Sequence, residues 1–136
     1  MPPMRPVIQP IYSTLLMVIG VALITNPDSF PPGPYTYTFR LFGPVTWGWV
    51  LLNVGLFAFG AFTAPDWGRW TRAQFVLACV ATALQCATML AWAGFLTVAA
   101  FDPDLTVSVA GPAMWTAGAL ANMVALWRIG HGRPRR

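Results

Sequence analysis

Residues 74–100 read QFVLACVATALQCATMLAWAGFLTVAA, a run that contains no Asp, Glu, Lys, Arg or His. A helix needs about 20 predominantly apolar residues to cross a bilayer core that is about 30 Å thick. A longer run must tilt or project beyond that core. Because hydrocarbon offers no partner for open backbone groups, we expect these residues to form a membrane-spanning helix.

Three further runs of the same kind lie at residues 7–25, 41–63 and 107–127, and none of them holds a charged residue or histidine. Each run meets the length that a spanning helix needs, the first only just. We therefore predict an all-α integral membrane protein. Its single domain, residues 1–136, would place four transmembrane helices in two antiparallel hairpins.

The composition agrees with the membrane class and argues against a nucleic-acid partner. Hydrophobic residues make up 57% of the chain and charged residues 9%, whereas soluble domains carry about 25% charged residues. The net charge of +4 comes from eight arginines and no lysine. These arginines lie at the chain ends and in short connections, so they do not form the basic face that nucleic acid requires.

The first run has two interpretations. Arg5 followed by the apolar residues 15–24 has the order of charged and apolar regions found in a signal peptide. However, no small-x-small cleavage signature follows, since the chain continues as ALITNPDSFPP. A retained first helix is the favoured interpretation.

The distribution of charge predicts the orientation. With four spans, seven of the eight arginines share one side of the membrane, and Arg40 shares the other with Asp28, Asp102 and Asp104. Cytoplasmic loops carry an excess of positive charge, so both termini should be cytoplasmic in a bacterial inner membrane. The cytoplasmic arginines are Arg5, Arg69, Arg72, Arg128, Arg133, Arg135 and Arg136.

The stretch APDWGRWTRAQF, residues 64–75, is the expected cytoplasmic turn between the second and third spans. We expect Trp67 and Trp70 at the level of the headgroups, while Arg69 and Arg72 meet anionic lipid. The tail adds Arg128, Arg133, Arg135 and Arg136, which would fix the topology and hold the same lipid.

The outer connection, residues 26–40, reads NPDSFPPGPYTYTFR and is rich in Pro and aromatic residues. It lacks helical periodicity, so we predict an ordered loop that lies on the outer headgroups with half-buried rings. The alternative is a contact surface for an extracytoplasmic partner.

Two outer helix starts resemble each other, GPVTW at residues 43–47 and GPAMW at residues 111–115. One interpretation is duplication of a helical hairpin in parallel orientation. The other is convergence, because Pro suits the first turn of a helix and Trp suits the membrane interface.

Small residues are expected to hold the spans together, because close packing drives helix association in lipid. Gly48 and Gly55 of the second span would allow another helix to approach closely. The third and fourth spans carry two ladders with a spacing of four, which we predict to form a seam within the protein. Their members are Cys79, Ala83, Ala87 and Ala91, and Ala113, Ala117, Ala121 and Ala125.

Asn53, Gln85 and Asn122 are the polar residues predicted deepest in the membrane. We expect their amides to hydrogen-bond one another. The alternative is that they line a water-filled path in an oligomer.

The chain offers little for catalysis, so we expect neither an enzyme nor a metal or cofactor site. Its one histidine, His131, lies beyond the last span. Cys79 and Cys86 are separated by about 10 Å along a helix, too far for a disulfide with each other. A proton-coupled antiporter is disfavoured, because such proteins place an ionisable residue inside the bilayer.

In layout, with arginine as its only basic residue type and the block RLFGPVTWGWVLL at residues 40–52, the chain resembles the small four-span, holin-like membrane proteins of actinobacterial bacteriophages. The resemblance implies a homo-oligomer that permeabilises the membrane. Two other functions stay open. One is an accessory subunit of a membrane complex, including a phage protein that excludes a second phage. The other is a four-helix protein that binds a lipophilic molecule.

Overall fold

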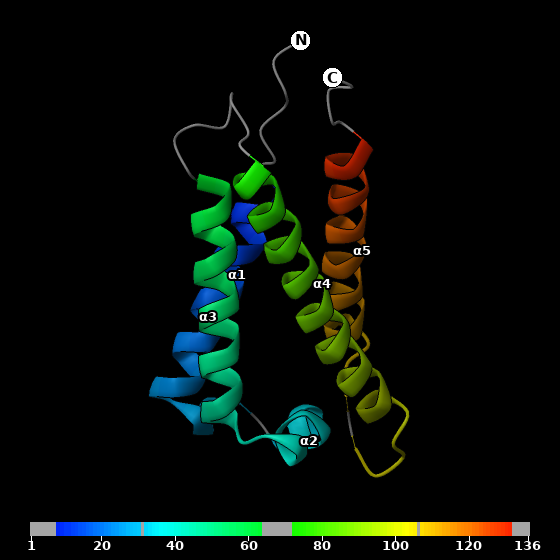
Figure 1. Cartoon of the computed structure of the whole chain (residues 1–136). Coiled ribbons are helices and arrows are strands. Elements are labelled where there is room, and N and C mark those ends of the chain that lie inside the picture. Colours follow the sequence, from blue (N-terminus) through cyan, green and yellow to red (C-terminus); the bar gives the residue numbers. More distant parts are fainter. Residues whose placement is uncertain (1–7, 31, 64–71, 106, 132–136) are drawn as a thin grey trace.

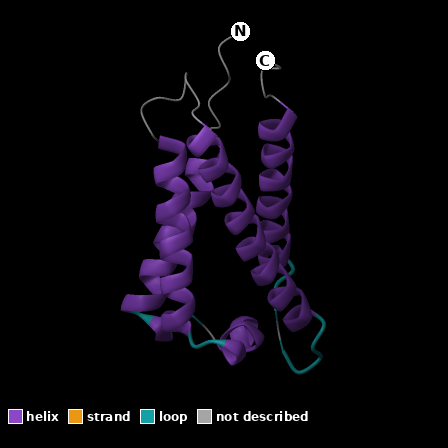
Figure 2. Ribbon diagram, viewed as in Figure 1, coloured by secondary structure: helices purple, strands orange, loops and turns teal. Residues whose placement is uncertain are grey.

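The residues that the computed structural model describes, 8–30, 32–63, 72–105 and 107–131, form helices that are joined by short connections (Figure 2). No strand occurs among these residues, so the all-α prediction is confirmed. The elements are α1 (Ile8–Thr25), the short 3-10 helix η1 (Pro27–Ser29), α2 (Pro32–Leu41), α3 (Pro44–Thr63), α4 (Arg72–Ala100) and α5 (Ala110–His131).

Three of these helices, α1, α3 and α4, are long and apolar enough to cross a membrane. They coincide within a few residues with the first three predicted runs. Helix α3 begins at Pro44, three residues later than predicted, since proline is well placed in the first turn of a helix, where its missing N–H is not needed. Helix α5 covers most of the fourth run and continues to His131.

The helices pack in two pairs, α1 against α3 and α4 against α5. The start of α1 and the end of α5 lie at the same end of the bundle (Figure 1). Helix α4 runs obliquely, from the side of α3 where it begins toward α5 where it ends (Figure 1). Whether so long an apolar run tilts in the bilayer or projects from it stays a prediction.

Glycines bring the backbones of α1 and α3 into direct contact. A Cβ atom at position 20 would lie 2.7 Å from the backbone nitrogen of Leu52 and 2.8 Å from the carbonyl oxygen of Gly48. A Cβ atom at position 55 would lie 2.8 Å from the carbonyl oxygen of Ser13. The close approach predicted for Gly48 and Gly55 is therefore confirmed, and α1 is the helix that approaches.

The prediction of a loop over residues 26–40 is wrong, because Pro32–Leu41 forms the helix α2. Proline costs nothing at the first helical position. Tyr35 and Phe39 lie one turn apart, with stacked rings whose centroids are 5.6 Å apart. Helix α2 packs against α4, at the end of the bundle opposite the start of α1 and the end of α5 (Figure 1).

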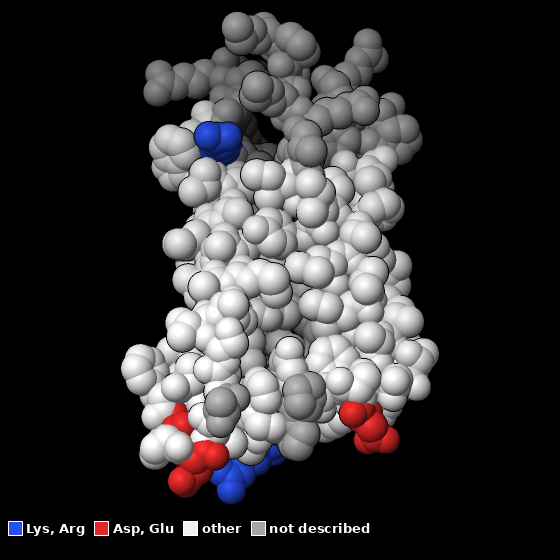
Figure 3. All heavy atoms as spheres, turned by 180° about the vertical axis from the view of Figure 1, so that it is seen from behind, with Lys and Arg blue, Asp and Glu red and all other residues white. Residues whose placement is uncertain are grey.

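Charged side chains gather at the two ends of the molecule, and the broad band between them shows none on the face seen in Figure 3. Of the described charged residues, Asp28, Arg40, Asp102 and Asp104 lie in or beside the connections at the α2 end. Arg72 and Arg128 lie at the other end, where α1 begins and α5 ends. The segregation is that of a molecule whose middle faces hydrocarbon.

The glycine contacts predict a position-dependent cost of adding one methyl group. Gly20→Ala should lower the free energy of unfolding by about 1–3 kcal/mol, because the new Cβ meets backbone atoms that cannot move independently. Gly94→Ala is the matched control, since a Cβ there meets nothing within 4 Å. Thermal unfolding in detergent measures both, and equal stability of the two variants would contradict the proposed contact.

Candidate functional site

Trp92 of α4 is the centre of an aromatic cluster at the α2 end of the bundle. Its side chain is 1% exposed. The centroid of its ring system lies 4.9 Å from that of Trp115 in α5 and 5.9 Å from that of Trp47 in α3. From α2, Tyr35 lies at 5.9 Å and Phe39 at 6.4 Å. Each such pair contributes about 0.5–1.5 kcal/mol beyond burial of its area, so Trp92 joins α2, α3, α4 and α5.

Two hydrogen bonds fix α2 against its neighbours. The indole Nε1 of Trp47 in α3 donates to the carbonyl oxygen of Thr38 at 2.7 Å. The hydroxyl of Tyr37 donates to Oδ2 of Asp102, in the connection after α4, at 2.6 Å. Helix α2 is thereby attached to both α3 and the far end of α4.

The Tyr37–Asp102 hydrogen bond shifts the pKa of both groups. The pKa of Asp102 lies below its ordinary value, because its carboxylate accepts hydrogen bonds from the Tyr37 hydroxyl and from the backbone N–H of Asp104. The pKa of Tyr37 lies above its ordinary value, because the same hydrogen bond and the charge of Asp102 stabilise the protonated phenol. The positive charge of Arg40 acts in the opposite direction and lowers the pKa of Tyr37.

The three predicted intramembrane amides lie in different environments. Asn53 is exposed on α3, and its Nδ2 donates to the carbonyl oxygen of Trp49 in the same helix at 2.8 Å. Gln85 and Asn122 are buried, with exposures of 0% and 1%. Asn122 donates to the carbonyl oxygen of Gly118 at 2.9 Å. The prediction that the amides bond one another is therefore wrong. Asn53 is bonded within its own helix, and neither polar atom of the Gln85 amide has a hydrogen-bond partner among the described residues.

Gln85 and Asn122 nevertheless lie on facing turns of α4 and α5. Met89, one turn after Gln85, places its sulfur 3.6 Å from Nδ2 of Asn122, and Cys86 places its sulfur 3.6 Å from the carbonyl oxygen of Ala119. Among the described residues, neither polar atom of the Gln85 amide has a hydrogen-bond partner, nor has Oδ1 of Asn122. An amide left without a partner in an apolar interior costs several kcal/mol, roughly 2–7 depending on the reference.

The seam between α4 and α5 forms on a different face from the one predicted. Helix α4 presents Cys86, Met89, Ala93 and Leu96 among its buried residues, and α5 presents Trp115, Ala119 and Asn122. The predicted ladders lie to the side: Ala83, Ala87, Ala113 and Ala117 are exposed, while Cys79, Ala91, Ala121 and Ala125 are half-buried. The prediction is wrong for the four exposed ladder residues, because Met89, Leu96 and Trp115 fill the seam together with the small residues Ala93 and Ala119.

Of the predicted interface residues, Arg72 and Arg128 are exposed at the end of the bundle where α1 begins and α5 ends. Trp67, Arg69, Trp70, Arg133, Arg135 and Arg136 lie outside the described residues. In the described part of the chain no group of three His, Cys, Asp or Glu side chains is placed to hold a metal ion.

Sequence reasoning missed the role of Trp92 and the attachment of α2. The available signal was the spacing of Tyr35 and Phe39, which puts both rings on one face if the segment is helical. The prolines around it concealed that helix.

Comparison with known proteins gives no relative: no protein-family model, no curated protein and no solved structure matches the chain.

The unpartnered amide of Gln85 predicts a stabilising substitution. Gln85→Met keeps the length of the side chain and removes both polar atoms, so it should raise the free energy of unfolding by about 1–3 kcal/mol. Asn122→Leu is the comparison, because it also removes the bond to Gly118 and should gain less. Unfolding in detergent measures both, and destabilisation by Gln85→Met would mean that the amide has a partner in the membrane.

The Tyr37–Asp102 bond predicts a defined pH window for the attachment of α2. Because the pKa of Asp102 is lowered, the bond contributes above the ordinary carboxyl pKa of about 4 and is lost as the pH falls through the lowered value. Because the pKa of Tyr37 is raised, the bond contributes fully below about pH 10 and is lost as the pH rises through the raised value.

Asp102→Asn should bring the pKa of Tyr37 back toward its ordinary value, since the carboxylate charge is gone. The measurement is a spectrophotometric titration of the chain's three tyrosines, with Tyr37→Phe identifying the curve of Tyr37 by difference. A Tyr37 curve unchanged by Asp102→Asn would show that the two groups do not interact in solution.

Proposed function

We propose that the protein is a self-associating, four-span protein of the bacterial cytoplasmic membrane that permeabilises this membrane as holins do. The observation that supports it is the outward position of the small-residue ladders on α4 and α5. Ala83 and Ala87 on α4, with Ala113 and Ala117 on α5, are exposed on the protomer. Small residues at a lipid-facing position allow a second helix to approach closely.

The fourth span in this proposal is α5, so that α1 with α3 and α4 with α5 make two antiparallel hairpins. With 22 residues, α5 has a length of about 33 Å, enough for a hydrocarbon core of about 30 Å. Its described charged or titratable groups are Arg128 and His131, both in the last turn. It also packs along α4, which is apolar enough to span.

The orientation in this proposal has both termini in the cytoplasm and the first helix retained. Arg72 and Arg128, at the end where α1 begins and α5 ends, support it through the positive-inside rule. The carboxylates of Asp28, Asp102 and Asp104 lie at the opposite end. The backbone contact of α1 with α3 at Gly20 supports retention, because α1 is part of the packed bundle.

Permeabilisation of the kind proposed needs apolar spans that associate, short connections and a cationic cytoplasmic side. The chain combines these with arginine as its only basic residue type. In an assembly built through the alanine faces, α4 and α5 of neighbouring copies would line the contact. The polar amides of Gln85 and Asn122 lie on these same two helices.

A second candidate function is binding of a small lipophilic molecule with polar groups inside the bundle. The observation that favours it is the pair of buried amides, Gln85 and Asn122, with polar atoms that lack a partner among the described residues. A molecule retained after purification in detergent, and lost from Gln85→Met, would favour this function over permeabilisation.

The proposed function predicts the behaviour of cells that express the protein. Expression in a bacterial host, followed with a potential-sensitive dye, should give an abrupt collapse of membrane potential. A muralytic enzyme co-expressed in the cytoplasm should be released at that time. A stable potential at comparable membrane expression would refute permeabilisation.

The double variant Ala83→Leu/Ala117→Leu should abolish the collapse, because bulk at exposed positions leaves the protomer intact but blocks its association. We expect self-association to weaken about tenfold, as for an overpacked contact that costs about 1–3 kcal/mol. Energy transfer between labelled copies in vesicles measures it. Thr46→Leu, at an exposed position of α3 away from both ladders, is the control that should associate normally.

A further inference from the structure

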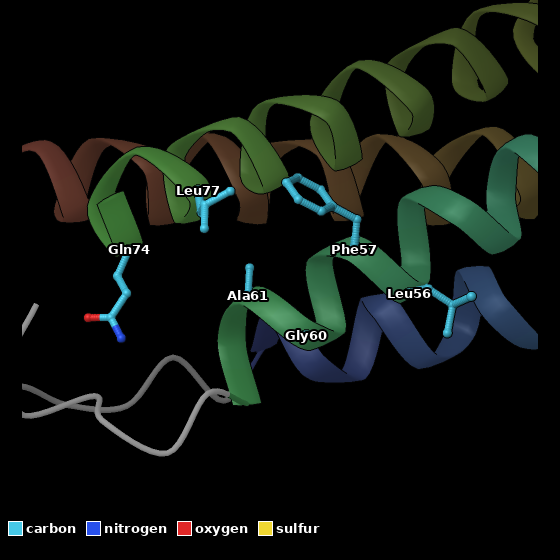
Figure 4. Close-up of a pocket in the computed structure, with 6 residues that line it drawn as sticks. All are labelled: Leu56, Phe57, Gly60, Ala61, Gln74 and Leu77. Carbon is cyan, nitrogen blue, oxygen red and sulfur yellow. The ribbon is translucent and has the colours of Figure 1, made fainter. Parts of the chain in front are cut away.

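A groove of about 370 Å³ lies between α3 and the beginning of α4, lined by Leu56, Phe57, Gly60, Ala61, Gln74 and Leu77 (Figure 4). Phe57 and Ala61 point from α3 toward α4, and Leu77 points back from α4. Gln74 lies at the end of the groove where α4 begins. We call this feature the α3–α4 groove.

The groove exists because α3 carries two small residues in succession at this level. A Cβ atom at Gly60 would meet nothing within 4 Å, so the space beside it is open. Leu56, Phe57, Gly60 and Leu77 are all exposed on helices apolar enough to span a membrane. The groove therefore opens toward the hydrocarbon.

The charge at this end of the molecule suits an anion. Arg72, which is exposed, begins α4 two residues before Gln74. The amino end of α4 adds the positive end of a helix dipole. The described carboxylates, Asp28, Asp102 and Asp104, all lie at the opposite end.

We propose that the α3–α4 groove holds one acyl chain of an anionic phospholipid, whose phosphate lies at Arg72. A chain of methylene groups is the occupant that suits a narrow apolar groove open to the bilayer. The volume of the groove falls within the range of about 300–1,000 Å³ that is usual for small-molecule sites. The apolar lining matches the acyl half of a lipid, and Arg72, which begins α4 just before Gln74 but does not line the groove, is the cation for its headgroup.

This site depends on α3 and α4 lying in the membrane, but not on self-association or permeabilisation. Bound anionic lipid would fix the inclination of α4 against α3 at the end where these helices come together. Lipid binding at the α3–α4 groove is therefore tested separately from permeabilisation, on the purified full-length chain.

The test is native mass spectrometry of the chain in detergent, with dioleoyl phosphatidylglycerol or dioleoyl phosphatidylcholine added as the probe. The expected result is retention of one phosphatidylglycerol molecule and weak retention of phosphatidylcholine. Arg72→Gln should lower retention about fivefold, the effect of one charge near the surface. Gly60→Leu should lower it about tenfold, because its side chain occupies the groove where methylene groups would lie.

Two matched controls accompany these variants. Gly94→Leu adds the same side chain at another exposed glycine, on α4, where a Cβ also meets nothing within 4 Å. Arg128→Gln removes another exposed arginine at the same end of the molecule. Both should retain phosphatidylglycerol as the unmodified chain does. Thermal unfolding verifies that Gly60→Leu is folded, and Arg72→Gln tests the site without altering the bundle.

Three results would overturn the proposal. Equal retention of the two lipids would show that the headgroup charge is not recognised. Equal loss from Gly60→Leu and Gly94→Leu would show that the lipid covers the whole surface without a site. Full retention by Arg72→Gln would remove Arg72 from the site. If retention follows the expected pattern while cells keep their membrane potential, the lipid site stands and the permeabilising function fails.

Discussion

Hydrocarbon supplies no hydrogen-bond partner, and this constraint determines how the chain uses its polar side chains. Ser13, Thr82 and Thr88 each donate to the carbonyl oxygen four residues earlier in their own helix. Asn53 and Asn122 do the same with their amides. Each polar group satisfied in this way can face either lipid or another helix. Gln85, whose amide lies further from the backbone, keeps both polar atoms without a described partner at the centre of the bundle.

Since polar contacts between helices are few, two other devices hold the described bundle together. The α1–α3 pair relies on backbone contact at Gly20, Gly48 and Gly55, where any side chain would separate the helices. The other helices meet around Trp92, whose size allows it to contact α2, α3 and α5 at once. The glycine contacts allow α1 and α3 to approach closely. The Trp92 side chain fills the wider space that opens where α4 diverges from α3.

Much of the helical layout could be predicted, because the lengths of the apolar runs and the positions of arginine are properties of the linear chain. The close approach at Gly48 and Gly55 could also be predicted from the sequence, since glycine permits it whichever helix packs there. The sequence could not predict which face of each helix packs against its neighbour. In a spanning helix both faces are apolar, so the ladder at Ala83 and Ala87 did not reveal that it points away from α5. Helix α2 was missed because tertiary contact with Trp92, and not local propensity, accounts for it.

The positions of these contacts along the chain have a consequence for biosynthesis. Every glycine contact of the α1–α3 pair lies within the first 63 residues, so this pair can form before α4 has been made. Helix α2 is synthesised between α1 and α3, yet its partner Trp92 emerges later. The second helix to be translated is therefore among the last to reach its final contacts. A nascent chain halted after α3 would hold α2 through its bond to Trp47, but without the ring contacts of Trp92 and the bond to Asp102.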